Sequence, residues 1–249
     1  MILNNQSYKP ARIIAFYLPQ FHPVPENDVF WEKGFTEWTN VGKAKPLYPG
    51  HKQPKLPTEL GYYDLRVPEV RELQADLARR YGIGGFCYWH YWFGHGKQML
   101  DRPLREMVES GSPDFPFCIG WANESWHGFD HGLKTKSYLI QQTYPGEEDD
   151  RKHFMSLLPA FKDRRYIKVD GKPLFVIYHP LDSPAAIRSY IYLCLSLASL
   201  LSLCSFHFVV ISFFPVTSIA SLLFFRFLAV LCCLFLDLLP YFSCLFLRF

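Results

Sequence analysis

Cysteine is scarce in the first three quarters of the chain. Of the seven cysteines only Cys87 and Cys118 precede residue 190, and neither stands in a metal-binding or redox spacing. Residues 1–10 are polar and lack the basic and apolar regions that a secretory signal requires. These features predict neither a disulfide framework nor export. We therefore expect the part of the chain before residue 190 to be cytoplasmic.

An excess of charge of one sign is also absent. The 249 residues carry 26 Lys and Arg against 23 Asp and Glu, and the net charge of +3 is too small to predict a nucleic acid partner. A run of lysines between residues 43 and 55 lies near no glycine-rich phosphate cradle. Its interspersed prolines favour a solvated loop over a site for the phosphates of a sugar donor.

Metal-binding patterns are equally sparse. His127 and His131 have the i, i+4 spacing of a helical metal site, but no Glu lies between them. The flanking Gly128 and Gly132 disfavour a helix there. We therefore predict no metal and no cofactor.

What the chain does contain is an alternation of apolar runs with amphipathic segments. The apolar runs lack the polar alternation of a half-exposed strand and are predicted to be buried parallel strands, at 12–18, 84–89, 117–122 and 173–178. Three segments with helical spacing of apolar residues are predicted helices, at 67–78, 99–110 and 147–162. This order predicts an α/β fold, namely the amino-terminal half of a (β/α)8 TIM-like barrel.

Three finer predictions concern the segments around these elements. Pro159 predicts a kink or an early end of the third helix. Residues 169–172 predict a hairpin turn. The stretch from Pro19 to about Arg66 is predicted to be a long loop without regular structure, which in a compact domain is usually functional.

Polar and aromatic residues follow the predicted strands, at the end where a parallel barrel carries its site. Carboxylates and amides bind sugar hydroxyls, and indole faces stack on the C–H face of a sugar ring, so this pattern favours a glycan ligand. Glu37 and Glu124 are the candidate catalytic carboxylates. The candidate substrate-binding residues are Gln20, His22, Trp38, Asn40, His90, Tyr91, Trp121, Asn123 and Trp126.

Structural roles compete with these functional ones. Glu124 could cap the segment that follows it, and the tryptophans could belong to the core, where strand aromatics ordinarily lie. His22 and His90 could instead have structural roles, with their hydrogen bonds made to neighbouring loop residues. If the functional interpretation holds, Gln20, His22, His90, Asn123 and Glu124 converge at one end of the strands.

From residue 190 onward the composition changes completely. Only Arg226, Asp237 and Arg248 are charged, glycine is absent, and about three fifths of the residues are Phe, Leu, Ser or Pro. Translated non-coding or frame-shifted sequence would explain this bias, and a membrane segment with spans at 191–214 and 218–239 is the alternative. We expect a barrel domain over 1–189 and a hydrophobic helical tail over 190–249, with membrane association through that tail if it is genuine.

Four motifs together resemble one family. They are Ala15–Pro23, Gly34–Val41, Gly85–Phe93 and Trp121–Trp126. The stretch from about Arg12 to Asp182 resembles the WbsX-type glycosyltransferases, which are associated with polysaccharide and O-antigen synthesis. That family is similar to glycoside hydrolase family 99, whose members are (β/α)8 barrels acting on mannose-containing glycans.

The resemblance implies a glycan or sugar-donor substrate and glycosyl transfer. The alternatives are an endo-mannosidase-like hydrolase fragment and a non-catalytic glycan-binding half-barrel. Both families are expected to carry a later Asn-Glu-Trp-x-Glu motif, which holds the two catalytic glutamates of the hydrolases, and this sequence contains no such motif. The resemblance therefore implies an amino-terminal fragment that keeps sugar-binding residues but lacks the later catalytic glutamates.

Overall fold

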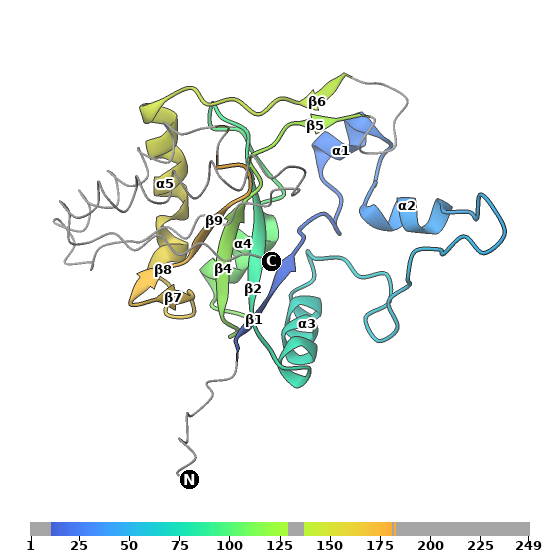
Figure 1. Cartoon of the computed structure of the whole chain (residues 1–249), viewed down its shortest axis with the longest axis horizontal. Helices are drawn as coiled ribbons and strands as arrows, with labels where there is room; N and C mark the ends of the chain where they lie inside the picture. The colour runs from blue at the N-terminus through green and yellow to red at the C-terminus, as the bar shows by residue number, and fades with distance from the viewer. Residues whose placement is uncertain (1–10, 129–136, 181, 183–249) are drawn as a thin grey trace, which may run out of the picture. The chain divides into compact units, whose positions relative to one another are not determined.

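The computed structural model describes residues 11–128, 137–180 and 182 (Figure 1). The predictions for the hydrophobic tail at 190–249, and the one for His131, concern residues outside these ranges. Among the residues that the structure describes, no helix is both long and apolar enough to cross a membrane.

The centre of the fold is a sheet whose main strands follow the order of the chain. These strands are β1 (Ile13–Tyr17), β2 (Ile83–Trp92), β4 (Phe117–Trp121) and β9 (Phe175–Ile177), in the order β1-β2-β4-β9. β1 pairs with β2 in parallel, and β4 pairs with β9 in parallel. β2 and β4 are joined by hydrogen bonds from Phe86 N to Pro116 O and from Ala122 N to His90 O. The residue numbers of the partners rise together on the two strands, as in a parallel pair. The predicted parallel α/β arrangement is confirmed.

Burial explains why these strands could be predicted. All five residues of β4 are buried, and so are most residues of β2, which is why their sequences read as continuous apolar runs. β1 differs, because Ile13 is 56% exposed and Phe16 is 50% exposed. Among the described residues β1 pairs only with β2, so it lies at an edge of the sheet.

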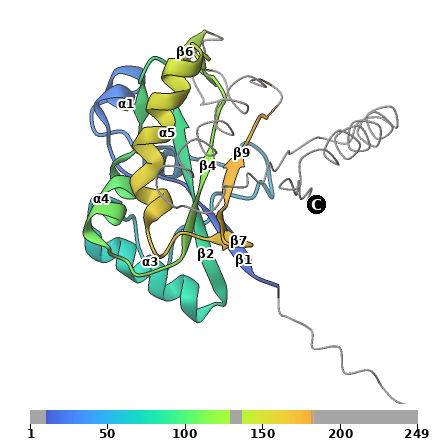
Figure 2. The same ribbon diagram turned by 90° about the vertical axis from the view of Figure 1, so that its left-hand side faces the viewer.

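The helices α3 (Pro68–Arg80) and α4 (Arg102–Ser110) lie on the same side of β2 (Figure 2). α3 begins with a proline, whose missing N–H costs nothing because the first N–H groups of a helix have no partner within it. Its last turn carries two arginines, whose positive charge suits the carboxyl end of the helix dipole. Gly111 follows α4 with φ at 76°, a value that glycine adopts without strain. The buried Arg71 of α3 forms an ion pair with Glu106 of α4 at 3.0 Å.

Helix α5 (Glu147–Lys162) has the predicted bounds, and it does not end early at Pro159 but continues to Lys162, while a kink at this proline stays a prediction. Pro159 lies in the last turn, and its missing N–H removes only the hydrogen bond to the carbonyl of Met155, one turn earlier. Met155 itself is 44% exposed. The buried Leu158 and Phe161 on either side of it hold the turn against the core.

The predicted unstructured loop between Pro19 and Arg66 contains two helices, which corrects that prediction. They are α1 (Pro25–Phe30) and α2 (Glu37–Lys43). Thr36 Oγ1 accepts a hydrogen bond from Trp38 N at 3.2 Å, and Thr39 Oγ1 accepts one from Thr36 N at 3.3 Å. This is a capping box in which Thr39 replaces the usual Glu or Gln, so the sequence signal was weak.

Short antiparallel pairs complete the fold. β3 (Gln98–Met99) pairs with the end of β2, so the second predicted helix begins only at Arg102. β5 (Trp126–His127) pairs with β6 (Tyr138–Ile140), and neither was among the predicted strands. β7 (Lys168–Val169) and β8 (Lys172–Pro173) confirm the predicted hairpin, whose turn residues both have positive φ, 51° and 79°.

The chain divides into two compact units. Of the residues that the structure describes, unit 1 comprises 11–89 and 102–118, and unit 2 comprises 90–101, 119–128, 137–180 and 182. β2 and β4 thus run from one unit into the other.

Candidate functional site

His22, which follows β1 in unit 1, is fully buried. Neither of its ring nitrogens forms a hydrogen bond of normal geometry with the described residues. Burial lowers the pKa of His22, and the carbonyl of Pro19 and the carboxylate of Asp64 oppose that shift. A neutral imidazole can donate one hydrogen bond and accept another, so His22 can serve a ligand hydroxyl in either way.

Glu37 and its neighbours also belong to unit 1. Burial raises the pKa of Glu37, and a hydrogen bond with Asn40 partly offsets this effect. Trp38 donates from Nε1 to the carbonyl of Tyr63 at 2.8 Å, and its ring packs 4.6 Å from that of Phe21. α2 therefore brings a carboxylate of raised pKa, an amide and a fixed indole together. Gln20, next to Phe21, is partly buried.

In unit 2, the amide of Asn123 joins the ends of β4 and β9. Its Oδ1 accepts from His179 N at 2.7 Å, and its Nδ2 donates to His179 O at 2.7 Å and to Tyr144 Oη at 3.0 Å. Tyr144 Oη in turn donates to the carbonyl of Asn123 at 3.2 Å. The amide is thus fully occupied within the protein, and the side chain is 1% exposed.

Glu124 lies beside His179, a residue that was not among the predicted site residues. The distance from Glu124 Oε2 to His179 Nε2 is 3.5 Å, and the two side chains are 44% and 39% exposed. His179 directly follows the predicted fourth apolar run, just as His22 and His90 follow or end earlier runs. That repeated position was the signal that could have identified it.

His90 belongs to a buried imidazole pair in unit 2. Its Nε2 is 2.8 Å from Nε2 of His153 on α5. Burial lowers the pKa of His90 to about 4, and burial together with His90 lowers the pKa of His153 well below its usual value. Trp92 stacks on the His153 ring at 4.6 Å, and Trp121 meets it edge-on at 4.8 Å. The pair is therefore neutral at neutral pH and enclosed by indoles.

The other predicted aromatic residues of unit 2 are also buried. Trp121, Trp126 and Tyr91 are 2%, 4% and 3% exposed. Trp121 donates from Nε1 to the Trp92 carbonyl at 3.0 Å, and the rings of Tyr91 and Trp126 are 5.1 Å apart. Unit 2 thus brings Asn123 and Glu124 together with His179, while His90 and the three aromatic residues lie in its interior. Roles for all of them in ligand binding stay predictions.

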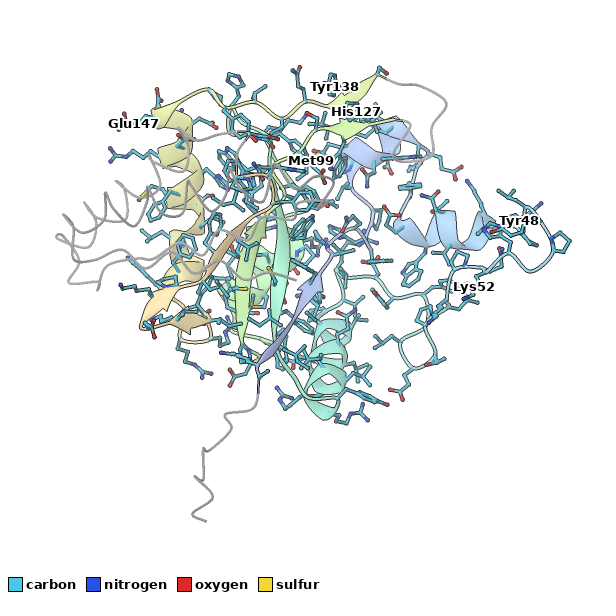
Figure 3. All side chains as sticks on the ribbon, viewed as in Figure 1. Tyr48, Lys52, Met99, His127, Tyr138 and Glu147 are labelled. Carbon is cyan, nitrogen blue, oxygen red and sulfur yellow. The ribbon has the colours of Figure 1, made fainter. Side chains whose placement is uncertain are left out.

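Two further observations bear on the chemistry. Among the described ranges, no three His, Cys, Asp or Glu side chains gather as metal ligands would. The contact with Cys118 and burial raise the pKa of the Cys87 thiol, which disfavours a nucleophilic thiolate there. Separately, in unit 2, His127 on β5 and Tyr138 on β6 pack ring against ring with centroids 4.4 Å apart, and Figure 3 labels both residues.

Comparison with known proteins gives one family. The sequence profile described as Glycosyltransferase WbsX matches residues 13–222, and so extends beyond the four motifs, which end at Trp126. Protein WxcX of Xanthomonas campestris pv. campestris, from strains B100 and ATCC 33913 and described as uncharacterized, is 43% identical over 180 residues. The matched region covers 72% of this chain and 26% of each relative, so the chain spans about a quarter of their length.

Two solved structures show partial similarity. The GH99 endo-alpha-mannosidase from Bacteroides thetaiotaomicron is 17% identical with a TM-score of 0.44, and the alignment covers 80% of this chain and 55% of that one. A structure described as a glycoside hydrolase-like protein is 15% identical with a TM-score of 0.38, covering 71% and 56% of the two chains.

Proposed function

Because the chain belongs to the Glycosyltransferase WbsX family, we propose that it forms the glycan-binding part of an enzyme that transfers sugars in polysaccharide synthesis. One observation carries this proposal. Glu124 follows a fully buried strand, yet its carboxylate remains 44% exposed beside the imidazole of His179. Such a pairing of an acceptor with a possible donor at the end of a parallel strand suits a hydroxyl-rich ligand.

The carboxylates of the two units would have different roles. Glycosyl transfer and hydrolysis pass through states with oxocarbenium character, which nearby carboxylates stabilise. Glu124, which is exposed beside the imidazole of His179, suits the binding of a sugar hydroxyl. Glu37 has a raised pKa because it is buried, which favours the protonated form that a general acid needs.

We also propose that residues 1–189 form one domain, the first half of a (β/α)8 barrel. Four strands in sequential parallel order support this proposal. The exposed apolar side chains Ile13, Phe16 and Leu18 at and just after β1 further support it, because an edge strand of this kind requires a neighbour to cover it.

Hydrolysis is the second candidate, and the raised pKa of Glu37 favours it, because glycosidases protonate the leaving oxygen with such a carboxyl. The two candidates differ in their products. A transferase lengthens an acceptor glycan when a sugar nucleotide is present, whereas a hydrolase shortens a glycan with water alone. Mass spectrometry of the glycan after incubation distinguishes them.

The test of the proposal is binding to a glycan array by the full chain and by Glu37→Gln and Glu124→Gln variants. Loss of a charged hydrogen-bond partner costs about 1.5–3 kcal/mol, so Glu124→Gln should bind roughly 10- to 100-fold more weakly. Glu37→Gln should bind only roughly 2- to 10-fold more weakly, because the raised pKa of Glu37 favours a neutral carboxyl, whose hydrogen bond contributes about 0.5–1.5 kcal/mol. Glu148→Gln is the control, because the Glu148 side chain is 85% exposed on α5 and forms an ion pair with Lys152 on the same helix. Failure of the chain to bind any glycan, or undiminished binding by both variants, would contradict the proposal.

A further inference from the structure

We infer that His179 contacts the glycan together with Glu124, and that Asn123 is a positioning residue that holds His179 and Tyr144 at the shared end of β4 and β9. This inference rests on the proposed function and deepens it, since it names the groups of unit 2 that meet the ligand. It also assigns different roles to two neighbouring residues. Glu124 binds the glycan, whereas Asn123 positions His179 and Tyr144.

The hydrogen bonds of Asn123 continue the ladder between β4 and β9. Trp121 pairs with Ile177, and Tyr178 N donates to Trp121 O at 3.0 Å as the last backbone bond. Beyond it, the Asn123 amide takes the place of a backbone peptide, because its Oδ1 and Nδ2 bind N and O of His179, both at 2.7 Å. The position of His179 is therefore fixed by a side chain rather than by strand pairing.

Tyr144 completes the bracket from a third segment. Its hydroxyl accepts from Asn123 Nδ2 at 3.0 Å and donates to Asn123 O at 3.2 Å. The loop that carries it is attached to β2, since Thr143 donates from N and from Oγ1 to the Phe93 carbonyl at 3.0 and 2.9 Å. Gly94 permits this approach, because a Cβ at that position would collide with Thr143.

Glu124 and His179 keep open positions toward the solvent. Their separation of 3.5 Å exceeds the usual 2.7–3.2 Å of a hydrogen bond between nitrogen and oxygen, so neither saturates the other. The ring of Tyr178 lies 4.3 Å from that of His179 and adds an aromatic surface beside them. Burial and the carboxylate of Glu124 raise the pKa of Tyr178, which agrees with the proximity of these two side chains.

This geometry fits a neutral sugar residue. A sugar hydroxyl donates one hydrogen bond and accepts another, so a single hydroxyl can donate to Glu124 Oε2 and accept from His179 Nε2–H. The Tyr178 ring offers a face or edge for the apolar side of the sugar. A phosphate or carboxylate ligand fits less well, because it would meet the carboxylate of Glu124 at the same place.

The test uses the full chain with labelled histidine rings and, as probes, the methyl α-glycosides of mannose, glucose, galactose and rhamnose. NMR titration should shift the His179 ring signal, identified by its loss in His179→Gln, and leave the signal of His51 unchanged. His179→Ala and Asn123→Ala should each weaken binding of the responding glycoside about tenfold. The variant with both changes should bind no more weakly than His179→Ala alone, because Asn123 acts through His179.

Two variants keep the result interpretable. Asn123→Asp retains the acceptor for His179 N and should lie between wild type and Asn123→Ala, even if the latter folds poorly. Glu148→Gln should bind as wild type. If Glu124→Gln weakens binding but His179→Ala does not, the inference falls and the proposed function stands. Additive effects of Asn123 and His179 would overturn the positioning role, and binding of none of the four probes together with an unresponsive array would overturn both proposals.

Discussion

Each unit has a polar cluster in its interior, and these two clusters differ in chemistry, although unit 2 also contains the buried ion pair of Arg165 and Asp163. Unit 1 has a charged clasp, in which the 3% exposed Arg71 donates to Leu65 O at 2.6 Å and pairs with Glu106 at 3.0 Å. Glu106 also accepts from Arg102 Nε at 2.6 Å. Unit 2 instead has a neutral cluster of His90, His153 and their flanking indoles.

Because of this difference, the stability of the two clusters should depend differently on pH. Burial raises the pKa of Glu106, but the hydrogen bonds and charges of Arg102 and Arg71 outweigh it, so the clasp persists until acidic pH. The imidazole pair is stable while its histidines are neutral, so its contribution falls as the pH drops below 6.5, the ordinary pKa of histidine. The clasp therefore depends on keeping its charges, and the imidazole pair depends on remaining neutral.

Asp149 is the polar anchor of the neutral cluster, so its removal should have the largest effect. Its Oδ2 accepts from Trp92 Nε1 at 2.9 Å and its Oδ1 accepts from Gly96 N at 2.8 Å. Asp149→Ala leaves the buried Trp92 Nε1 and the exposed Gly96 N without their acceptor. It should lower the free energy of unfolding by about 3 kcal/mol, at about 1–3 kcal/mol for the buried donor and less for the exposed one. Urea unfolding of the full chain measures this change.

The control for this variant is Glu147→Ala, which also removes an acid from the first turn of α5 but from an exposed position (Figure 3). It should cost only the interaction with the helix dipole, about 0.3–1 kcal/mol. Equal effects of the two variants would show that the helix dipole, rather than the bonds to Trp92 and Gly96, explains the role of Asp149.

Acidification should weaken unit 2 more than unit 1. The pKa of His90 is about 4 in the folded chain and about 6.5 in an unfolded one, so the unfolded state binds the proton more readily. Stability is therefore complete above pH ~6.5 and declines as the pH falls toward 4, by about 1.4 kcal/mol per pH unit and about 3 kcal/mol in all for this group. Amide hydrogen exchange at a series of pH values, corrected for intrinsic rates, reports the loss for each unit.

His22 gives unit 1 a smaller response of the same sign, because burial lowers its pKa while Pro19 and Asp64 oppose the shift. His22→Asn should remove the loss of protection in unit 1 between pH 6.5 and 4 and leave that of unit 2 unchanged. Equal losses in both units of this variant would contradict the assignment to His90 and His153.

The sequence predicted those elements whose signals lie within a short stretch of chain. The parallel strands, α5 and the hairpin at 169–172 depend on local patterns, namely apolar runs, an acidic first turn and turn residues. α1 and α2 were missed because their capping residues are less common, and β5 and β6 because strands of two and three residues carry no period.

The residues that the candidate site residues contact were harder to predict than the site residues themselves. Glu124 and Asn123 stand out because they follow a buried strand, but His153 and Asp149 meet β2 across 63 and 57 residues of chain. No local pattern encodes such contacts. The acids that begin α5 also suit the helix dipole, so the sequence alone did not indicate the bond from Trp92 to Asp149.

The clasp of unit 1 offers the smallest and most specific test of the contrast. Glu106→Gln keeps the shape of the side chain but removes the charge between Arg71 and Arg102. It should lower the free energy of unfolding by about 1 kcal/mol, because the carboxylate faces a buried arginine on one side and solvent on the other. Glu109→Gln, whose partner Arg105 is exposed on the same helix, should have almost no effect.

Salt then separates charge from shape. At about 1 M salt the screening length falls to roughly 3 Å, so the difference between wild type and Glu106→Gln should shrink by about half. The cost of Asp149→Ala should stay nearly constant, because it arises mainly from the buried Trp92 donor left without its acceptor rather than from exposed charge. A salt-independent cost of Glu106→Gln would mean that the contact with Arg71 stabilises unit 1 by packing alone, and the contrast between the two interiors would then rest only on their response to pH.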